Sequence, residues 1–168
     1  MVSEVIELLS STPDKIRREI ASLSPHQLKA RPAPDKWSIQ EILAHLDDAE
    51  ELGMRARVAA MIEQSEPSLA PFDQEQRAIE QQYQKKAPLA SLDHFARQRR
   101  ANVKWLRALK PAQLKRKGHH QAVGEITAGE MIHEWAFHDL GHLKQILEVK
   151  RYWLWPHMGN MQQFYKLS

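Results

Sequence analysis

Apolar residues recur every three or four positions along most of this chain, which is the spacing of one face of an α-helix. Runs in which Val, Ile, Thr or aromatic residues alternate with polar ones would indicate strands, and such runs are missing. Glycine is also scarce, at 6 of the 168 residues. The sequence therefore predicts an all-α protein without strands. Its four long amphipathic segments predict a four-helix bundle with short extra helices.

Capping signals mark where two of these helices begin. Ser38 with Glu41, and Thr127 with Glu130, match the capping-box pattern, in which a hydroxyl and a carboxyl group satisfy free amide donors. Pro13 lies inside the first apolar segment, where the helix is expected to restart or bend. The expected long helices cover residues 2–23, 38–62, 92–109 and 127–149, with a short helix near residues 72–83 and a loop at residues 118–124.

The composition excludes several classes of protein. The absence of cysteine excludes disulfides, thiolate metal sites and a catalytic cysteine. No apolar run approaches the roughly 20 residues of a membrane-spanning helix. The N-terminus lacks the basic and then apolar pattern of a signal peptide. We therefore expect a cytoplasmic protein with one domain over residues 1–168 and no membrane partner.

The charge balance is mildly basic, with 24 Lys and Arg against 21 Asp and Glu and a formal net charge of +3. The cations cluster at residues 97–100 and 115–117, but no aromatic residues are interleaved with them. Single-strand binders use such aromatics to stack on bases. We interpret the two clusters as a solvated helix surface and a basic loop, not as a nucleic-acid site.

Two of the nine histidines have metal-ligand spacing. His138 and His142 are four residues apart, so on a helix their side chains lie on one face, about 40° apart. Trp135 and Ile146 fall on the same face, which places the pair at the edge of a buried surface. Imidazoles there need a hydrogen-bond partner or a metal, because an unpaired buried polar group costs roughly 1–3 kcal/mol.

His45 is the candidate for a third ligand. On the second helix it shares a face with Ile42, Ala49 and Leu52, and a bundle can bring this helix beside the last one. Three histidines that leave one position open are typical of a catalytic metal site. A core histidine satisfied by a hydrogen bond is the other interpretation. The predicted metal ligands are His45, His138 and His142.

The remaining histidines give no such pattern. The sequence His133-Glu134 begins like the zinc-protease motif, but Phe137 stands where the second histidine is required. We expect His133 to face solvent. Five others are also expected at the surface, namely His26, His94, His119, His120 and His157.

Two stretches of the chain resemble the DinB superfamily. Residues 36–46, KWSIQEILAHL, resemble its second-helix signature, and GEIT at 124–127 followed by HDLGHLKQI at 138–146 is similar to its last-helix signature. The order and spacing of these motifs cover nearly the whole chain, from Leu8 to Val149. The resemblance implies an up-down-down-up bundle, commonly dimeric, with a divalent metal on three histidines. Those positions match His45, His138 and His142.

The same resemblance outlines the chemistry. The family includes thiol S-transferases that use bacillithiol or mycothiol, a mycothiol-dependent maleylpyruvate isomerase, hydrolases, and members of unknown activity. It implies a metal-dependent thiol S-transferase or hydrolase acting on a small molecule. Zinc, nickel and iron are the candidate metals, because imidazole suits each of them. A divalent ion on three neutral histidines can activate water or a thiol. Since the chain has no cysteine, that thiol would come from a low-molecular-weight cosubstrate.

The alternative is a non-catalytic binding or scaffold protein in which the metal only pins two helices together. Closure of the site by a fourth protein ligand would favour it, and Asp48 and Glu41, about a turn either side of His45, are the candidates. Glu134 and Glu41 could instead orient ligand imidazoles, or simply face solvent. The aromatic tail at residues 152–155 is expected to pack on the bundle or on a partner, and with the resemblance it predicts a homodimer.

Overall fold

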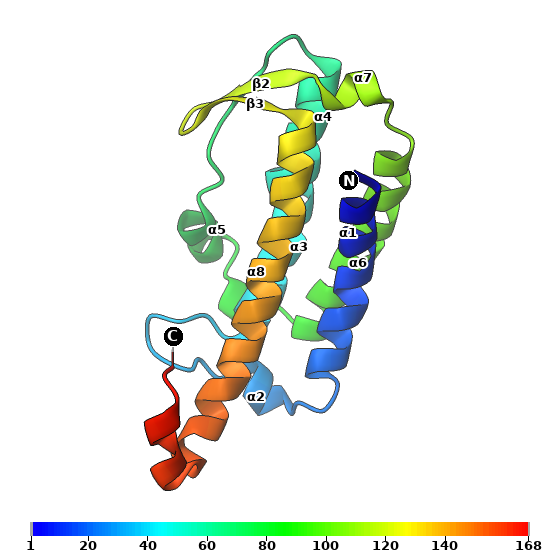
Figure 1. Ribbon diagram of the computed structural model, residues 1–168. Coiled ribbons are helices and arrows are strands. Elements are labelled where there is room, and N and C mark those ends of the chain that lie inside the picture. The colour runs from blue at the N-terminus through cyan, green and yellow to red at the C-terminus, as the bar shows by residue number, and fades with distance from the viewer. Residues whose placement is uncertain (1, 168) are drawn as a thin grey trace.

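Four long helices form the body of the protein (Figure 1). The computed structural model describes residues 2–167. In chain order the helices are α1 (Val2–Ile20), α3 (Ile39–Ala49), which a π-helical segment (Glu50–Arg55) joins to α4 (Ala56–Glu63), α6 (Pro88–Arg107) and α8 (Ala128–Leu154). The predicted four-helix bundle is confirmed.

The helices follow the up-down-down-up course that the resemblance implies. α1 and α8 run in one direction, and α3 with α4, and α6, run in the other (Figure 1). α1 packs against α6 and α8, and α3 packs against the same two helices. The long connection from α4 back to α6 carries α5 (Gln74–Glu80) and a 3-10 turn (Tyr83–Lys85) outside the bundle. This crossover lets α3 and α6 run in parallel.

Short helices complete the predicted set. They are α2 (Pro25–Lys29), α7 (Pro111–Leu114) and two 3-10 turns after α8 (Trp155–His157 and Gly159–Phe164). Both predicted capping boxes are present: Ser38 Oγ accepts from the Glu41 amide and Thr127 Oγ1 from the Glu130 amide. Within residues 2–167, no helix has both the length and the apolar character needed to cross a membrane.

Pro13 does not end the first helix, because the structure supplies the hydrogen bond that proline removes. A proline has no N–H, so the carbonyl four residues earlier, that of Leu9, loses its helical donor. Arg99 Nη1 from α6 donates to this carbonyl at 2.8 Å. α1 therefore continues through Pro13 to Ile20 without restarting.

The prediction of no strands is wrong in one region. Residues 118–124, expected as a loop, belong instead to a hairpin of β2 (Lys117–His120) and β3 (Gly124–Thr127), and β1 (Ser68–Leu69) adds to it in parallel. Gly124 has a φ of 85°, which favours glycine at the turn. A Cβ on Gly118 would lie 2.8 Å from Met61 Cγ, so glycine lets β2 pack closely on α4. The pairing depends on backbone contacts that a side-chain pattern does not record.

The core is divided into two apolar clusters by a buried polar layer. One cluster surrounds Trp135 and Met61 near one end of the bundle, and the other surrounds Ile42 and Phe95 near the other end. Between them, α6 contributes Arg99 to the layer. The two carboxylates that flank it, Glu50 and Asp139, come from the π-helical segment and from α8.

Arg99 satisfies all five of its N–H donors within this layer. Its Nε and Nη2 donate to Glu50 at 2.8 and 2.7 Å, and Nη1 and Nη2 both donate to Asp139. The fifth bond is the one to the Leu9 carbonyl. Arg99 therefore joins all four long helices at one level. The sequence interpretation of residues 97–100 as a solvated run is wrong at Arg99, whose side chain is 1% exposed.

Candidate metal centre

Three histidines from two helices converge at the level of the polar layer. His45 on α3 is buried, and His138 and His142 on α8 are partly buried. The Nε2 atom of His138 lies 3.0 Å from that of His45 and 3.1 Å from that of His142. The structure thus brings together the three residues that the sequence singles out. In residues 2–167 they form the one group of histidine and carboxylate side chains with metal-ligand geometry.

Burial keeps these imidazoles neutral at pH 7. It lowers the pKa of His45 to about 2, with the nearby His142 and His138 acting in the same direction. Burial and the neighbouring His142 also lower the pKa of His138 to about 4. The pKa of His142 is lowered by burial as well, although its hydrogen bond to Gln145 opposes the shift. Neutral imidazole is the form that binds metals.

In His142, the hydrogen bond formed by Nδ1 determines that Nε2 faces the other two histidines. Its Nδ1–H donates to Gln145 Oε1 at 2.9 Å, so the Nε2 lone pair points toward the other two rings. This is the usual way in which a ligand imidazole is oriented from outside the metal site. Gln145 lies one turn along α8 from His142, but the sequence analysis did not single it out, because glutamine is common on helix surfaces.

Aromatic rings enclose His45. The ring centroids of Trp37, Phe72 and Tyr83 lie 5.2, 5.9 and 6.2 Å from that of His45. Trp37 precedes α3, whereas the other two come from the long crossover. They are remote from one another in sequence, so only the folded chain shows that they form one wall. Within the described residues, His45 Nδ1 is buried without a hydrogen-bond partner.

The carboxylates considered as a fourth ligand are engaged elsewhere. Asp48 accepts two hydrogen bonds from Arg77, and a third from the Tyr83 hydroxyl at 2.6 Å. Glu41 accepts from Ser38 and from Arg31. Burial favours the neutral form of Glu41, but these hydrogen bonds hold its pKa below the ordinary value. The two carboxylates therefore stabilise the surrounding loops and leave the histidine group open.

Other sequence expectations near the site have mixed outcomes. Glu134 is exposed and has no hydrogen bond to the three histidines among the described residues, so it does not orient them. His133 faces solvent as predicted, with its Nδ1–H donating to the Gly129 carbonyl. Leu52 is 50% exposed, although the helical period places it beside His45. The π-helical segment causes this difference, since its wider turns change the angular position of later side chains.

The geometry fits a divalent metal ion. Three neutral Nε2 atoms all lie within 4.8 Å of one another, and a neutral ring nitrogen without a proton can only accept. With metal–nitrogen bonds of about 2.0–2.1 Å, the nitrogens of a tetrahedral site lie about 3.3 Å apart, close to the observed spacings. A cation at their centre would satisfy all three lone pairs at once.

Fold and site together define a helical-bundle protein with a three-histidine group between its second and last long helices. The chain belongs to the DinB superfamily, whose family model matches residues 8–146. This confirms the resemblance noted in the sequence.

A curated relative and a solved structure agree with this assignment. A protein of Oceanobacillus iheyensis named "Putative metal-dependent hydrolase" is 23% identical over 150 residues, covering 89% of this chain and 86% of the relative. The structure of YfiT from Bacillus subtilis superposes with a TM-score of 0.83 at 21% identity, covering 92% of this chain and 88% of that one. It is described as "a probable metal-dependent hydrolase with an unusual four-helix bundle topology". At this identity, the likeness to YfiT shows the fold alone.

Proposed function

We propose that the protein binds one divalent metal ion through Nε2 of His45, His138 and His142 and acts as a metal-dependent hydrolase on a small molecule. The observation that carries the proposal is the convergence of three neutral imidazoles with no fourth protein ligand among the described residues. Structural zinc sites are normally closed by four protein ligands, whereas catalytic sites keep a position open. The names of the two relatives support the same class.

The residues of the chain have distinct parts in this proposal. A divalent ion at the site supplies Lewis-acid activation of the attacking group and of the bond to be cleaved. Gln145 holds the His142 ring in the tautomer that presents Nε2. The rings of Trp37, Phe72 and Tyr83 shield His45 from water and so strengthen electrostatic interactions inside the site.

Hydrolysis is expected to depend on added metal. Protein dialysed against a chelator should show no activity on a panel of esters, amides and lactams, and Zn²⁺, Ni²⁺ or Fe²⁺ should restore it in proportion to the bound metal. The measurement is product formation alongside elemental analysis. Activity that survives complete metal removal would contradict the proposal.

Thiol transfer is the second candidate, because an open metal position can also ionise a thiol. The same metal-loaded protein can be screened for conjugation of bacillithiol or mycothiol to electrophiles. Thiol-dependent product without hydrolysis would replace the hydrolase proposal. The non-catalytic scaffold would be favoured if the metal-loaded protein lacked both activities and an X-ray absorption spectrum showed a shell closed by protein atoms.

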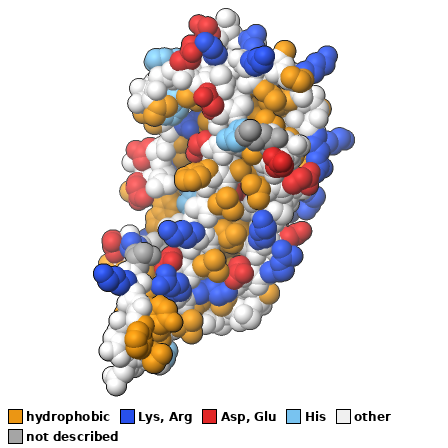
Figure 2. Space-filling model, in the orientation of Figure 1, with side chains coloured by type: hydrophobic (Ala, Val, Ile, Leu, Met, Phe, Trp, Pro, Cys, Tyr) orange, Lys and Arg blue, Asp and Glu red, His pale blue; other side chains and the backbone are white. Residues whose placement is uncertain are grey.

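We propose, further, that the protein is a cytoplasmic homodimer. Leu140, Leu147 and Leu154 recur every seven residues on the outer side of α8 and are 44%, 41% and 64% exposed. The segment that follows adds exposed Phe164 and Tyr165, and Figure 2 shows hydrophobic side chains gathered over this end of the molecule. Exposed apolar side chains that gather on one face of a molecule mark interaction sites.

Light scattering is expected to give twice the monomer mass at micromolar concentration, and Leu147→Glu should shift the protein toward monomer by placing a charge in the interface. An unchanged mass for wild type and variant, at the value of one chain, would contradict the dimer. Thermal unfolding of the variant controls for loss of fold.

A further inference from the structure

A small cavity adjoins the three-histidine group on one side of α8. It is about 230 Å³ in volume, somewhat below the roughly 300–1,000 Å³ of typical ligand pockets, so it suits a small group. Two residues of its wall contact the site: the Trp37 ring lies 5.2 Å from that of His45, centroid to centroid, and Gln145 is hydrogen-bonded to His142. Gly141, which also lines the cavity, directly precedes His142 on the helix.

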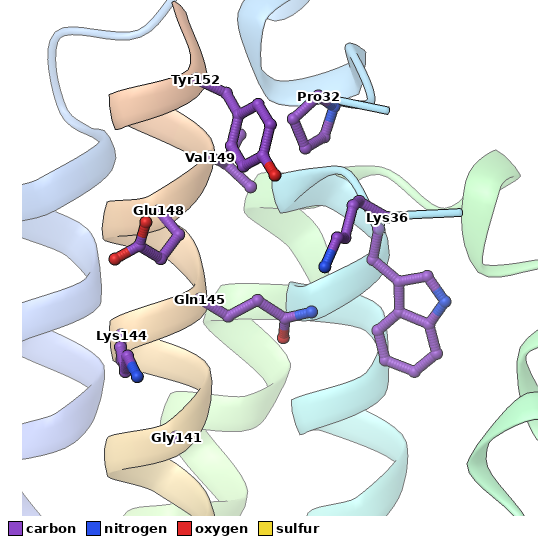
Figure 3. Close-up of a pocket in the computed structure, with 9 residues that line it drawn as sticks. Pro32, Lys36, Gly141, Lys144, Gln145, Glu148, Val149 and Tyr152 are labelled. Carbon is purple, nitrogen blue, oxygen red and sulfur yellow. The ribbon is translucent and has the colours of Figure 1, made fainter. Parts of the chain in front are cut away.

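The cavity is lined by cationic and amide donors, with Glu148 and the Tyr152 hydroxyl as its other polar side chains. Lys36 and Lys144 line it, and neither ammonium group forms an ion pair or hydrogen bond with any residue in 2–167. Figure 3 shows the Lys36 amine directed from the loop before α3 toward α8, and the Gln145 side chain extended from α8 toward Lys36. Since Gln145 Oε1 accepts from His142, its amide nitrogen is left to donate.

The one carboxylate in the lining does not cancel this charge. Both oxygens of Glu148 accept from Arg151 Nη1, at 2.7 and 2.8 Å, so the negative charge is paired on the same helix. The remaining wall is largely apolar and includes Pro32, Trp37 and Val149. A ligand that fits this lining has an anionic group at one end and an apolar body.

We infer that this cavity binds the carboxylate group of a small organic acid and so selects the substrate of the site. The inference rests on the proposed function, because it places the remainder of that molecule beside the three histidines. Figure 3 shows the Lys36 amine and the Gln145 amide extended toward one another, with Lys144 on the opposite side of α8, so Lys36 and Gln145 are the groups that can donate to one carboxylate. The bond from the Lys36 ammonium is charge-assisted, and such hydrogen bonds are the strong ones. A neutral molecule of the same shape would form no charge-assisted bond with Lys36 and bind less well.

Benzoate and its neutral isostere benzamide are suitable probes, measured by NMR titration of the chelator-treated and of the zinc-loaded protein. Benzoate is expected to give saturable shifts in both forms, at residues lining the cavity, and benzamide to bind at least about tenfold more weakly. Equal affinity for the two probes would overturn the inference. Because binding to the chelator-treated protein is measured without metal, this result is separate from the proposed metal chemistry.

Substitution of the lysines identifies the site of binding. Lys36→Gln should weaken benzoate binding about tenfold, whereas Lys144→Gln should weaken it less, because Figure 3 shows Lys144 on the other side of α8. Lys104→Gln, which removes an exposed lysine from α6 outside the cavity, is the matched control and should bind as wild type. Metal content should stay at wild-type level in all of these variants. Unchanged benzoate affinity in Lys36→Gln would refute the assignment.

Gly141 permits an independent test by filling the cavity. A Cβ at this position meets no heavy atom within 4 Å, so a side chain can extend without disturbing the packing. Gly141→Trp is expected to abolish benzoate binding and Gly141→Ala to retain it, with unchanged circular dichroism and metal content in both. Retained binding in the Trp variant would place benzoate elsewhere. If wild-type protein bound benzoate but took up no metal, the proposed function would be overturned and the inference of a carboxylate pocket would stand.

Discussion

Replacement of His142 by alanine is expected to lower metal affinity by more than about 100-fold and to reduce bound metal well below one ion per chain. The reason is that the variant removes one of three converging Nε2 atoms, and the two carboxylates considered as a fourth ligand, Asp48 and Glu41, are engaged with Arg77 and Arg31. Loss of an outer partner alone commonly costs 10–100-fold in affinity, and loss of a ligand costs more. Elemental analysis and competition with a chromophoric chelator measure both quantities.

His133→Ala is the matched control for this prediction. It removes an imidazole from the same helix, but one that is exposed and bonded to the Gly129 carbonyl. Its metal content should equal that of wild type. The metal content of Gln145→Leu should fall between those of His142→Ala and His133→Ala. This variant keeps all three ligands but removes the hydrogen bond that orients the His142 ring. Full metal occupancy in His142→Ala would show that the three histidines do not form the site.

Replacement of Arg99 by alanine is expected to destabilise the protein by about 3–5 kcal/mol. The variant would leave Glu50 and Asp139 buried without their shared cation. Removing one partner of a buried ion pair typically costs this much stability. The Leu9 carbonyl, already without a helical donor because of Pro13, would also lose its partner. Denaturant unfolding monitored by circular dichroism gives the free energy directly.

Arg100→Ala provides the comparison, since this neighbouring arginine is exposed. Substitutions at such positions usually change stability by no more than about 0.5 kcal/mol. Asp139 directly follows His138, so we also expect weaker metal binding in Arg99→Ala under conditions where it remains folded. A loss of stability below about 1 kcal/mol would mean that the polar layer does not join the four helices as described.

The local features of the chain could be read from its sequence because they depend on residues within one helical turn. The capping boxes at Ser38 and Thr127 each involve residues three positions apart, and both are present. The pairing of His138 with His142 follows from the helical repeat in the same way. His45 required a further step, namely that α3 lies beside α8, which a helical bundle allows and the structure shows.

Tertiary structure alone decided the features that depend on contacts between distant residues. Arg99 belongs to a basic run typical of a helix surface, yet it is buried, because Glu50, Asp139 and the Leu9 carbonyl meet it from three other helices. The hairpin at residues 117–127 depends on backbone pairing, which side-chain periodicity does not encode. The sequence by itself determined the helices, their caps and the candidate ligands, since helical geometry relates neighbouring residues directly. Which faces meet, and hence which polar groups are buried and paired, followed only from the packing of the whole chain.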